Sequence, residues 1–229
     1  MKTGGLADVT GSLPKYFDKK NYDVRVILPK YVCMEERWKG QLHFLCHFYV
    51  NLNWRKQYVG IFETTYDGIT YYLVDNEFYF AGNAPYNNIY EDVEKFAFFS
   101  KAVLEALPYL DFCPDIIHCH DWQTGLIPVY LKNEFQADSF YWGMKSIMTI
   151  HNLKFQGVWD IKTMQGLTGF SASLFTPDKL EFKKDANMLK GGLVYADYIT
   201  TVSDSYAQEI QTEYYAVSYT HLTLPTICS

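Results

Sequence analysis

The sequence predicts an α/β fold in which a mostly parallel sheet carries an antiparallel insertion. Short β-branched segments, such as residues 145–150, alternate along the chain with segments of helical periodicity, such as residues 91–107. Between residues 40 and 75 the pattern changes to consecutive strands, and Asp67-Gly68 is a strong hairpin signal there. Because strands separated by helices pair in parallel and hairpin strands pair antiparallel, both kinds of pairing are expected.

Apolar periodicity, turn residues and cap residues place the individual elements. We expect helices at residues 6–19, 91–107, 123–133, 187–196 and 204–211, and strands at residues 23–28, 42–52, 57–63, 69–74, 115–119, 145–150 and 198–202. Pro29 closes the first of these strands, and Ser203 is a natural N-cap for the last helix. The strand at 42–52 alternates, so His43 and His47 are expected to face solvent, with Phe44 on the opposite face.

Composition excludes several classes of protein. The chain has 229 residues, of which 48% are hydrophobic and 20% charged, as in a soluble globular domain. Its net charge is −6 with no basic run, so nucleic acid is not an expected partner. No apolar stretch approaches membrane-spanning length and no signal peptide is visible, so no membrane partner is expected. The five cysteines form no CxxC pair, which favours free thiols and a cytoplasmic location.

The first residues have the pattern of a phosphate-binding loop that opens a helix. Gly4 and Gly5 let backbone N–H groups approach a ligand, and the positive end of the following helix would favour an anion. Lys2 adds a mobile positive charge suited to phosphate. The alternative is an ordinary turn, with Asp8 placed in the first helical turn by the helix dipole alone. The similar sequence Lys190-Gly191-Gly192 lies inside a helical pattern, where close helix packing is the favoured explanation.

Polar residues follow two of the expected parallel strands directly. Asp121 comes just after the strand at 115–119, and His151 and Asn152 follow the strand at 145–150. Open α/β sheets bind ligands at this carboxyl edge, where a carboxylate and an amide can both contact sugar hydroxyls. The alternative for Asp121 is a cap on the next helix. Trp122 is expected to serve packing.

His118 and His120 share one face of the same strand, because side chains repeat every second residue. Such a pair could belong to a metal-dependent hydrolase, although a metal site needs further ligands and an open coordination position. The other interpretation is a structural pair, which we favour, and no metal is expected.

Five motifs occur in a specific order along the chain. They are KTGGLADV at residues 2–9, NAPY at 83–86, HCHDW at 118–122, HN at 151–152 and LKGGLVYAD at 189–197. Together they resemble the N-terminal domain of bacterial glycogen synthases and plant starch synthases, and the resemblance extends to about Tyr214. These enzymes are retaining glucosyltransferases with two facing Rossmann-like domains, the architecture called GT-B.

The resemblance implies transfer of glucose from ADP-glucose to the non-reducing 4-hydroxyl of an α-1,4-glucan. No cofactor is implied, because ADP-glucose is the donor substrate. By resemblance, His151 and Asp121 are catalytic. The implied substrate-binding residues are Lys2, Gly4, Gly5, Asp8, Tyr86 and Asn152, and we expect all eight to line one cleft.

Both ends of the sequence depart from the family pattern. The short hydrophobic strand that precedes the loop in the family is absent before Lys2, and residues 216–229 do not match the family. We therefore expect an incomplete N-terminal catalytic domain at 1–215 and a non-family tail at 216–229. The second domain, which holds the main nucleotide pocket in the family, is missing. The fragment is expected to be inactive alone, and a non-catalytic glucan-binding remnant is the alternative.

Overall fold

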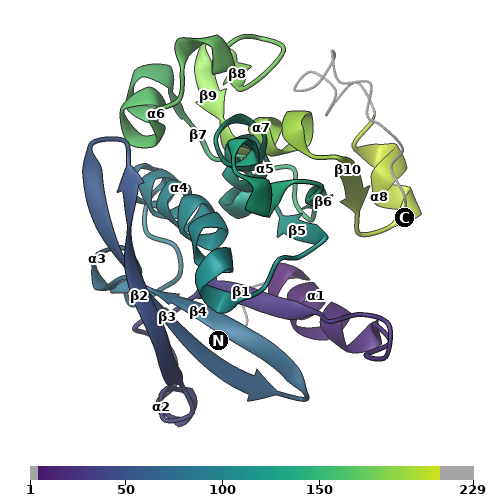
Figure 1. The fold of residues 1–229 in the computed structure, drawn as a ribbon. Helices are drawn as coiled ribbons and strands as arrows, with labels where there is room; N and C mark the ends of the chain where they lie inside the picture. Colours follow the sequence, from purple (N-terminus) through teal and green to yellow (C-terminus); the bar gives the residue numbers. More distant parts are fainter. Residues whose placement is uncertain (1–4, 212–229) are drawn as a thin grey trace. The chain divides into compact units, whose positions relative to one another are not determined.

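The computed structural model describes residues 5–211, which divide into two compact units (Figure 1). The first unit contains residues 5–51 and 56–88, and the second contains residues 52–55 and 89–211. The predicted Lys2, Gly4 and tail 216–229 lie outside the described residues.

The first unit is built on a four-stranded sheet with the order β1-β4-β3-β2. Its strands are β1 (Arg25–Pro29), β2 (His43–Leu52), β3 (Arg55–Tyr66) and β4 (Ile69–Asp75). β1 pairs with β4 in parallel and β4 pairs with β3 antiparallel, so the expected mixture of pairings is present. The helical segments are α1 (Gly5–Ser12), η1 (Leu13–Tyr16), α2 (Glu36–Lys39) and α3 (Glu77–Phe80).

Helix α1 ends earlier than the sequence pattern predicted. The α-helix stops at Ser12 and a short 3₁₀ turn follows, so the helix does not reach residue 19. Pro14 lies in that turn and explains the change, because proline has no N–H to donate and its ring clashes with the preceding turn of an α-helix.

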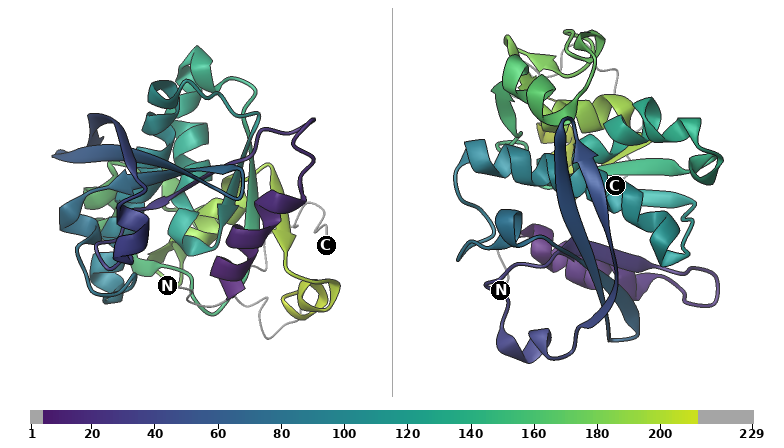
Figure 2. Two further views of the ribbon diagram at one scale, coloured as in Figure 1. Left: turned by 90° about the horizontal axis from the view of Figure 1, so that it is seen from below. Right: turned by 60° about the vertical axis from the view of Figure 1, so that its left-hand side comes forward.

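β2 and β3 form a long hairpin (Figure 2), and the β3–β4 turn follows a local sequence rule. Asp67 and Gly68 have φ angles of 51° and 71°, as a type I′ turn requires, so the predicted hairpin is confirmed. His43 and His47 are exposed as expected. Phe44, however, is 52% exposed and stacks on His47, so the prediction that it faces away from His47 was wrong. Regular alternation holds only from Cys46 onward.

The second unit contains a three-stranded sheet, all parallel, with the order β10-β6-β5. Its strands are β5 (Ile116–His120), β6 (Lys145–Ile150) and β10 (Tyr198–Thr201). Its α-helices are α4 (Ile89–Ala106), α5 (Leu126–Asn133), α6 (Ile161–Thr168), α7 (Met188–Tyr195) and α8 (Asp204–Glu209). Ser203 caps α8 through a hydrogen bond from Tyr206 N–H, which confirms the predicted cap.

Several short elements of the second unit were not predicted. They are α6, the small antiparallel sheet of β7 (Val158–Asp160), β8 (Glu181–Phe182) and β9 (Asp185–Asn187), and the 3₁₀ turns η2 (Leu107–Leu110), η3 (Trp122–Thr124), η4 (Phe135–Ala137), η5 (Ser139–Tyr141) and η6 (Ala172–Leu174). Strands of two or three residues are too short to show a period of two, which explains why the pattern missed them.

Close backbone packing joins α5, α7 and β6. A Cβ atom added to Gly125 would lie 2.3 Å from the carbonyl oxygen of Met188, and one added to Gly192 would lie 3.0 Å from the Cα of Gly125. Gly192 also faces the sulfur of Met148. The glycines at 191–192 therefore have the packing role that the sequence favoured.

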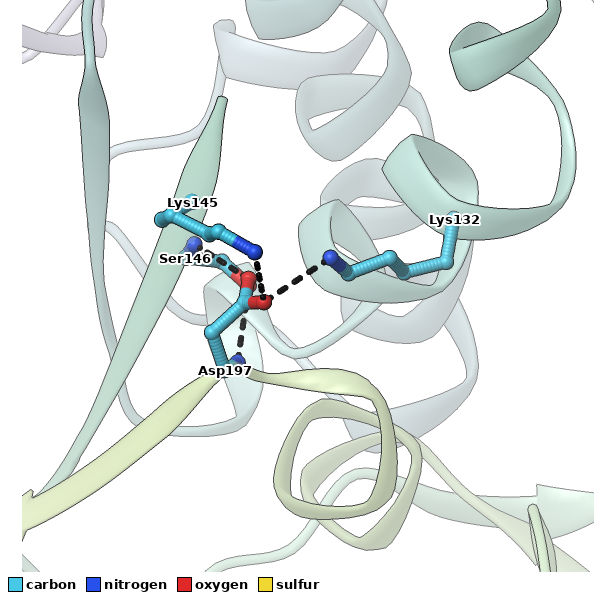
Figure 3. Close-up of polar contacts among 4 residues, drawn as sticks. All are labelled: Lys132, Lys145, Ser146 and Asp197. Atoms are coloured by element: carbon cyan, nitrogen blue, oxygen red, sulfur yellow. Dashed lines mark hydrogen bonds and ion pairs between the residues drawn. The ribbon is translucent and has the colours of Figure 1, made fainter. Parts of the chain in front are cut away.

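Asp197 ties the amino-terminal ends of β6 and β10 to helix α5 (Figure 3). Its carboxylate accepts hydrogen bonds from Ser146 N–H at 2.9 Å, from Lys132 at 3.0 Å and from Lys145 at 3.2 Å. Its own N–H donates to the carbonyl oxygen of Ser146 at 3.0 Å. Burial acts to raise the pKa of this carboxyl, but the hydrogen bonds from Ser146 and the two lysines outweigh it and lower the pKa.

Replacing this carboxylate should destabilise the chain. Asp197→Ala leaves the buried Ser146 N–H without its acceptor, so we expect a loss of about 1–3 kcal/mol in the free energy of unfolding at pH 7. Because the folded pKa is lowered, the contribution of Asp197 is present above pH ~4 and is lost as the pH falls through the folded pKa. Thermal melts between pH 7 and pH 3 test both points, and the variant should converge on the wild type at low pH. Asp115→Ala, at an exposed aspartate just before β5, is the control. Equal melting temperatures for wild type and Asp197→Ala at pH 7 would contradict this account.

Candidate functional site

The candidate site lies at the carboxyl edge of the parallel sheet in the second unit. Asp121 directly follows β5, and His151-Asn152 directly follow β6. The register pairs His120 with Thr149, and Asp121 N–H donates to the carbonyl oxygen of Thr149 at 3.0 Å. The ladder is thereby extended by one residue, and the two predicted segments are brought side by side.

The Asp121 carboxylate holds the backbone that follows β6. One oxygen, Oδ1, accepts hydrogen bonds from His151 N–H at 2.7 Å and from Asn152 N–H at 3.3 Å. The side chain makes no capping bond to the 3₁₀ turn that follows it, so the alternative of a helix cap was wrong. Burial raises the pKa of Asp121, while the hydrogen bonds from these two amides oppose that rise.

Asp121 also has a strained backbone, with φ 55° and ψ −173°. Residues other than glycine rarely adopt this conformation, and such strain persists only where the surrounding structure holds it in place. Here Asp121 is only 6% exposed, and the next residue, Trp122, is buried with its ring edge-on to Phe96. The expected packing role of Trp122 is consistent with this, and Asp121 is fixed from both sides.

Three histidine rings form a continuous cluster at this edge. His120 Nδ1 lies 3.0 Å from His151 Nε2, and the ring of His118 stacks on that of His120 with centroids 4.2 Å apart. His118 Nε2 lies 2.6 Å from the hydroxyl of Thr149, which in turn lies 2.6 Å from the hydroxyl of Thr200. Burial first, then the two neighbouring histidines, lowers the pKa of His120 to about 3. His120 is therefore neutral at pH 7.

These contacts bear on the hydrolase alternative for His118 and His120. One ring nitrogen of each histidine is engaged within the protein, by Thr149 and by His151 respectively. Between residues 5 and 211, no three His, Cys, Asp or Glu side chains are grouped so that they could hold a metal ion. The structural-pair interpretation accounts for both rings by these contacts.

Asn152 is exposed beside this cluster. Its side-chain oxygen accepts a hydrogen bond from Lys154 N–H at 3.0 Å, which fixes the local turn and leaves its amide group to serve as a donor. Leu153 N–H donates to the hydroxyl of Tyr206 at 3.0 Å, so helix α8 also supports this loop. The sequence analysis did not predict a role for Tyr206, Thr149 or Thr200, because no local motif surrounds these residues.

The remaining predicted residues belong to the first unit. Gly5 begins α1, and Asp8 is exposed in its first turn, where the helix dipole favours an acid. Tyr86 is 40% exposed in the segment between α3 and α4. The structure brings together Asp121, His151 and Asn152. One cleft shared with Gly5, Asp8 and Tyr86 stays a prediction.

Comparison with known proteins shows the family of the chain. Residues 1–223 match the family described as the starch synthase catalytic domain. The chain belongs to this family. It is 65% identical over 215 residues to a glycogen synthase from Lachnoclostridium phytofermentans and 63% identical to one from Lachnospira eligens. Each match covers 94% of this chain and 45% of the relative, so the chain spans about half the length of the curated relatives it matches.

A solved structure shares the fold. The catalytic domain of Starch Synthase IV from Arabidopsis thaliana, bound to ADP and acarbose, superposes with a TM-score of 0.85 at 28% identity. The match covers 95% of this chain and 45% of that one. The Rossmann-like α/β class of a GT-B glycosyltransferase is thus confirmed. Among the described helices of this family member, none is both long and apolar enough to cross a membrane.

Removing the Asp121 carboxylate should release the loop after β6. Asp121→Ala leaves the amides of His151 and Asn152 without their acceptor, whereas Asp121→Asn keeps an oxygen at the same place. A hydrogen bond to a charged group contributes about 1.5–3 kcal/mol, so hydrogen exchange at the His151 amide should accelerate roughly 10- to 100-fold in the alanine variant. The asparagine variant should show a smaller effect. Amide exchange measured by NMR tests this, and unchanged protection of His151 in Asp121→Ala would refute the role given to the carboxylate.

Proposed function

We propose that this chain is the N-terminal, largely acceptor-side domain of a glycogen or starch synthase. The whole enzyme would transfer glucose from ADP-glucose to the non-reducing 4-hydroxyl of an α-1,4-glucan, with retention at the anomeric carbon. Membership of the starch synthase catalytic domain family supports this, as do relatives named glycogen synthase and a structural neighbour bound to ADP and acarbose. The observation that carries the proposal is the Asp121 carboxylate, which fixes His151 and Asn152 at the ligand edge of the sheet.

Each residue of this edge has a proposed role. Asp121 holds the backbone of residues 151 and 152, so the loop is ordered before substrate arrives and its contacts cost little reorganisation. His151 would sit against the transferred glucose near the reacting carbon, with a ring kept neutral by burial, which lowers its pKa although Asp121 opposes the shift. A neutral ring avoids repelling the positive charge that develops at the anomeric carbon. The amide of Asn152 would donate to a sugar hydroxyl.

The N-terminal loop would act on the leaving group. Departure of ADP leaves negative charge on the diphosphate, and the amides of Gly4 and Gly5 with the ammonium of Lys2 are suited to stabilise it. Asp8 and Tyr86 would contact sugars in the same cleft. Donor and acceptor are substrates, so no cofactor and no metal are needed in this scheme. Closure against a second domain would complete the site and exclude water. Four free cysteines in the described chain suit a cytoplasmic location.

The non-catalytic remnant differs from a synthase domain in one measurable way. A synthase domain should support transfer once it is joined to a second domain, whereas a remnant should bind glucan and do no more. We expect the isolated chain to show no transfer from ADP-glucose to glycogen. A chimera should then show it, with residues 1–215 of this chain replacing the matched half of the 65%-identical glycogen synthase from Lachnoclostridium phytofermentans.

The site is tested in the same chimera. Asn152→Ala removes a hydrogen bond to sugar, so kcat/KM should fall roughly 10- to 100-fold, as loss of about 1–3 kcal/mol predicts. Asn51→Ala, at an exposed asparagine of β2, is the matched control and should transfer glucose as the parent does. A folded chimera without transfer would support the remnant, and full activity in Asn152→Ala would refute the role of Asn152.

A further inference from the structure

Two consecutive residues hold His151 from different sides. The carboxylate of Asp121 binds its backbone N–H at 2.7 Å, and Nδ1 of His120 lies 3.0 Å from its ring atom Nε2. The last residue of β5 and the residue after it thus set the ring orientation and the backbone position of His151. The first contact depends on the family motif residue Asp121, but neither the motif nor the comparisons assign any role to His120.

His120 is itself held firmly enough to orient another ring. Its backbone N–H donates to the hydroxyl of Thr124 at 2.7 Å, and that hydroxyl donates back to its carbonyl oxygen at 2.9 Å. Its ring stacks on His118 with an interplanar angle of 29°. A side chain fixed at the backbone and on one ring face loses little further entropy when its nitrogen contacts a partner.

Hydroxyl groups on the next two strands support the stack. His118 bonds to Thr149 of β6, and Thr149 bonds to Thr200 of β10. Thr149 is the register partner of both His120 and Thr200, so the parallel pairing places these three residues in one row, and His118, two residues earlier on β5, reaches Thr149 diagonally. The row crosses all three strands of the sheet and ends at His151.

We propose that His120 is a positioning residue that fixes the ring of His151 in one orientation and one tautomer for glucose transfer. The inference rests on the proposed function, since it gives His151 a reaction to be positioned for. His118 and the two threonines form the support behind His120.

Proton counting explains why the contact selects one tautomer of a neutral His151. A 3.0 Å contact between two ring nitrogens holds one proton, so one ring donates and the other accepts. Protonating both facing nitrogens would set two N–H groups against each other and leave no acceptor between them. The titratable groups that face His120 are His118 on its own strand, His151 after β6 and Asp121 beside it. The two histidines disfavour a positive charge on His120, which agrees with its lowered pKa.

The first test needs neither sugar nor nucleotide and uses the chain itself. Side-chain ¹⁵N spectra report the tautomer of each histidine, and a pH titration reports its pKa. In the wild type, the ring of His151 should show a single tautomer, and burial should keep its pKa below ~6.5, the ordinary histidine value. In His120→Ala the two tautomers of His151 should mix. His120→Asn places an amide near the former Nδ1 and should restore part of the wild-type behaviour.

His43→Ala is the matched control, because His43 is an exposed histidine of β2 in the first unit. It should leave the spectrum of His151 unchanged. A His151 spectrum that is the same in wild type and in His120→Ala, when both are folded, would overturn the inference whatever the enzyme does.

The second test measures transfer in the chimera described above. Misplacement of a reacting group by about 1 Å can cost roughly 10²-fold in rate, so His120→Ala should lower kcat by 10- to 100-fold. KM for ADP-glucose should change much less, and His120→Asn should recover part of kcat. A His151 ring that reorients without any loss of kcat would also overturn the positioning role. If the unmutated chimera transfers no glucose, the proposed function fails, and the spectra still decide whether His120 orients His151.

Discussion

The parallel register of β5, β6 and β10 is the constraint on which the second unit depends. It aligns the amino-terminal ends of the strands, where Asp197 ties Ser146 of β6 to Lys132 of α5. It also aligns the carboxyl ends, where Asp121 meets the backbone of His151. Because side chains in a strand alternate with a period of two, a slip by one residue would turn His118 and His120 to the other face. By holding the register at the amino-terminal edge, the contacts of Asp197 therefore help to keep Asp121 next to His151 at the carboxyl edge.

The family motifs at this edge combine chemistry with packing. Gly157, which has φ +63°, follows the His151-Asn152 loop, and a Cβ atom there would lie 2.4 Å from the ring of Trp122. Gly125 in turn packs against Gly192. The tryptophan and the glycines let β5, the loop after β6 and helix α7 approach closely, and this close approach buries Asp121 beside the amides that it holds. Motif segments that are far apart in the sequence are therefore in direct contact in the fold.

The sequence predicted the elements with strong local signals and missed what depends on tertiary structure. Residues 145–150 form β6 at the predicted bounds, and the turn at Asp67-Gly68 follows directly from residue type. Neither prediction needs distant residues. The hydrogen bond from His151 N–H to the Asp121 carboxylate could not be predicted in the same way. The two residues lie thirty positions apart in the sequence, and only the pairing of β5 with β6 brings them together. The shared face of His118 and His120 was predictable from the strand period. The contact from His120 to His151 was not.

The histidine cluster has an electrostatic consequence for the whole edge. Three imidazoles in contact cannot all take up protons, and burial already lowers the pKa of His120 to about 3. The charge nearest to His151 is therefore the Asp121 carboxylate, which two backbone amides partly neutralise. The three histidine rings therefore add no positive charge of their own to this edge, since the pKa of each is lowered. If glucose is transferred here as proposed, the developing oxocarbenium ion meets no repulsion from these rings. Stabilisation of the diphosphate then falls to groups other than the histidines, and the proposal assigns it to Lys2 and the amides of the N-terminal loop.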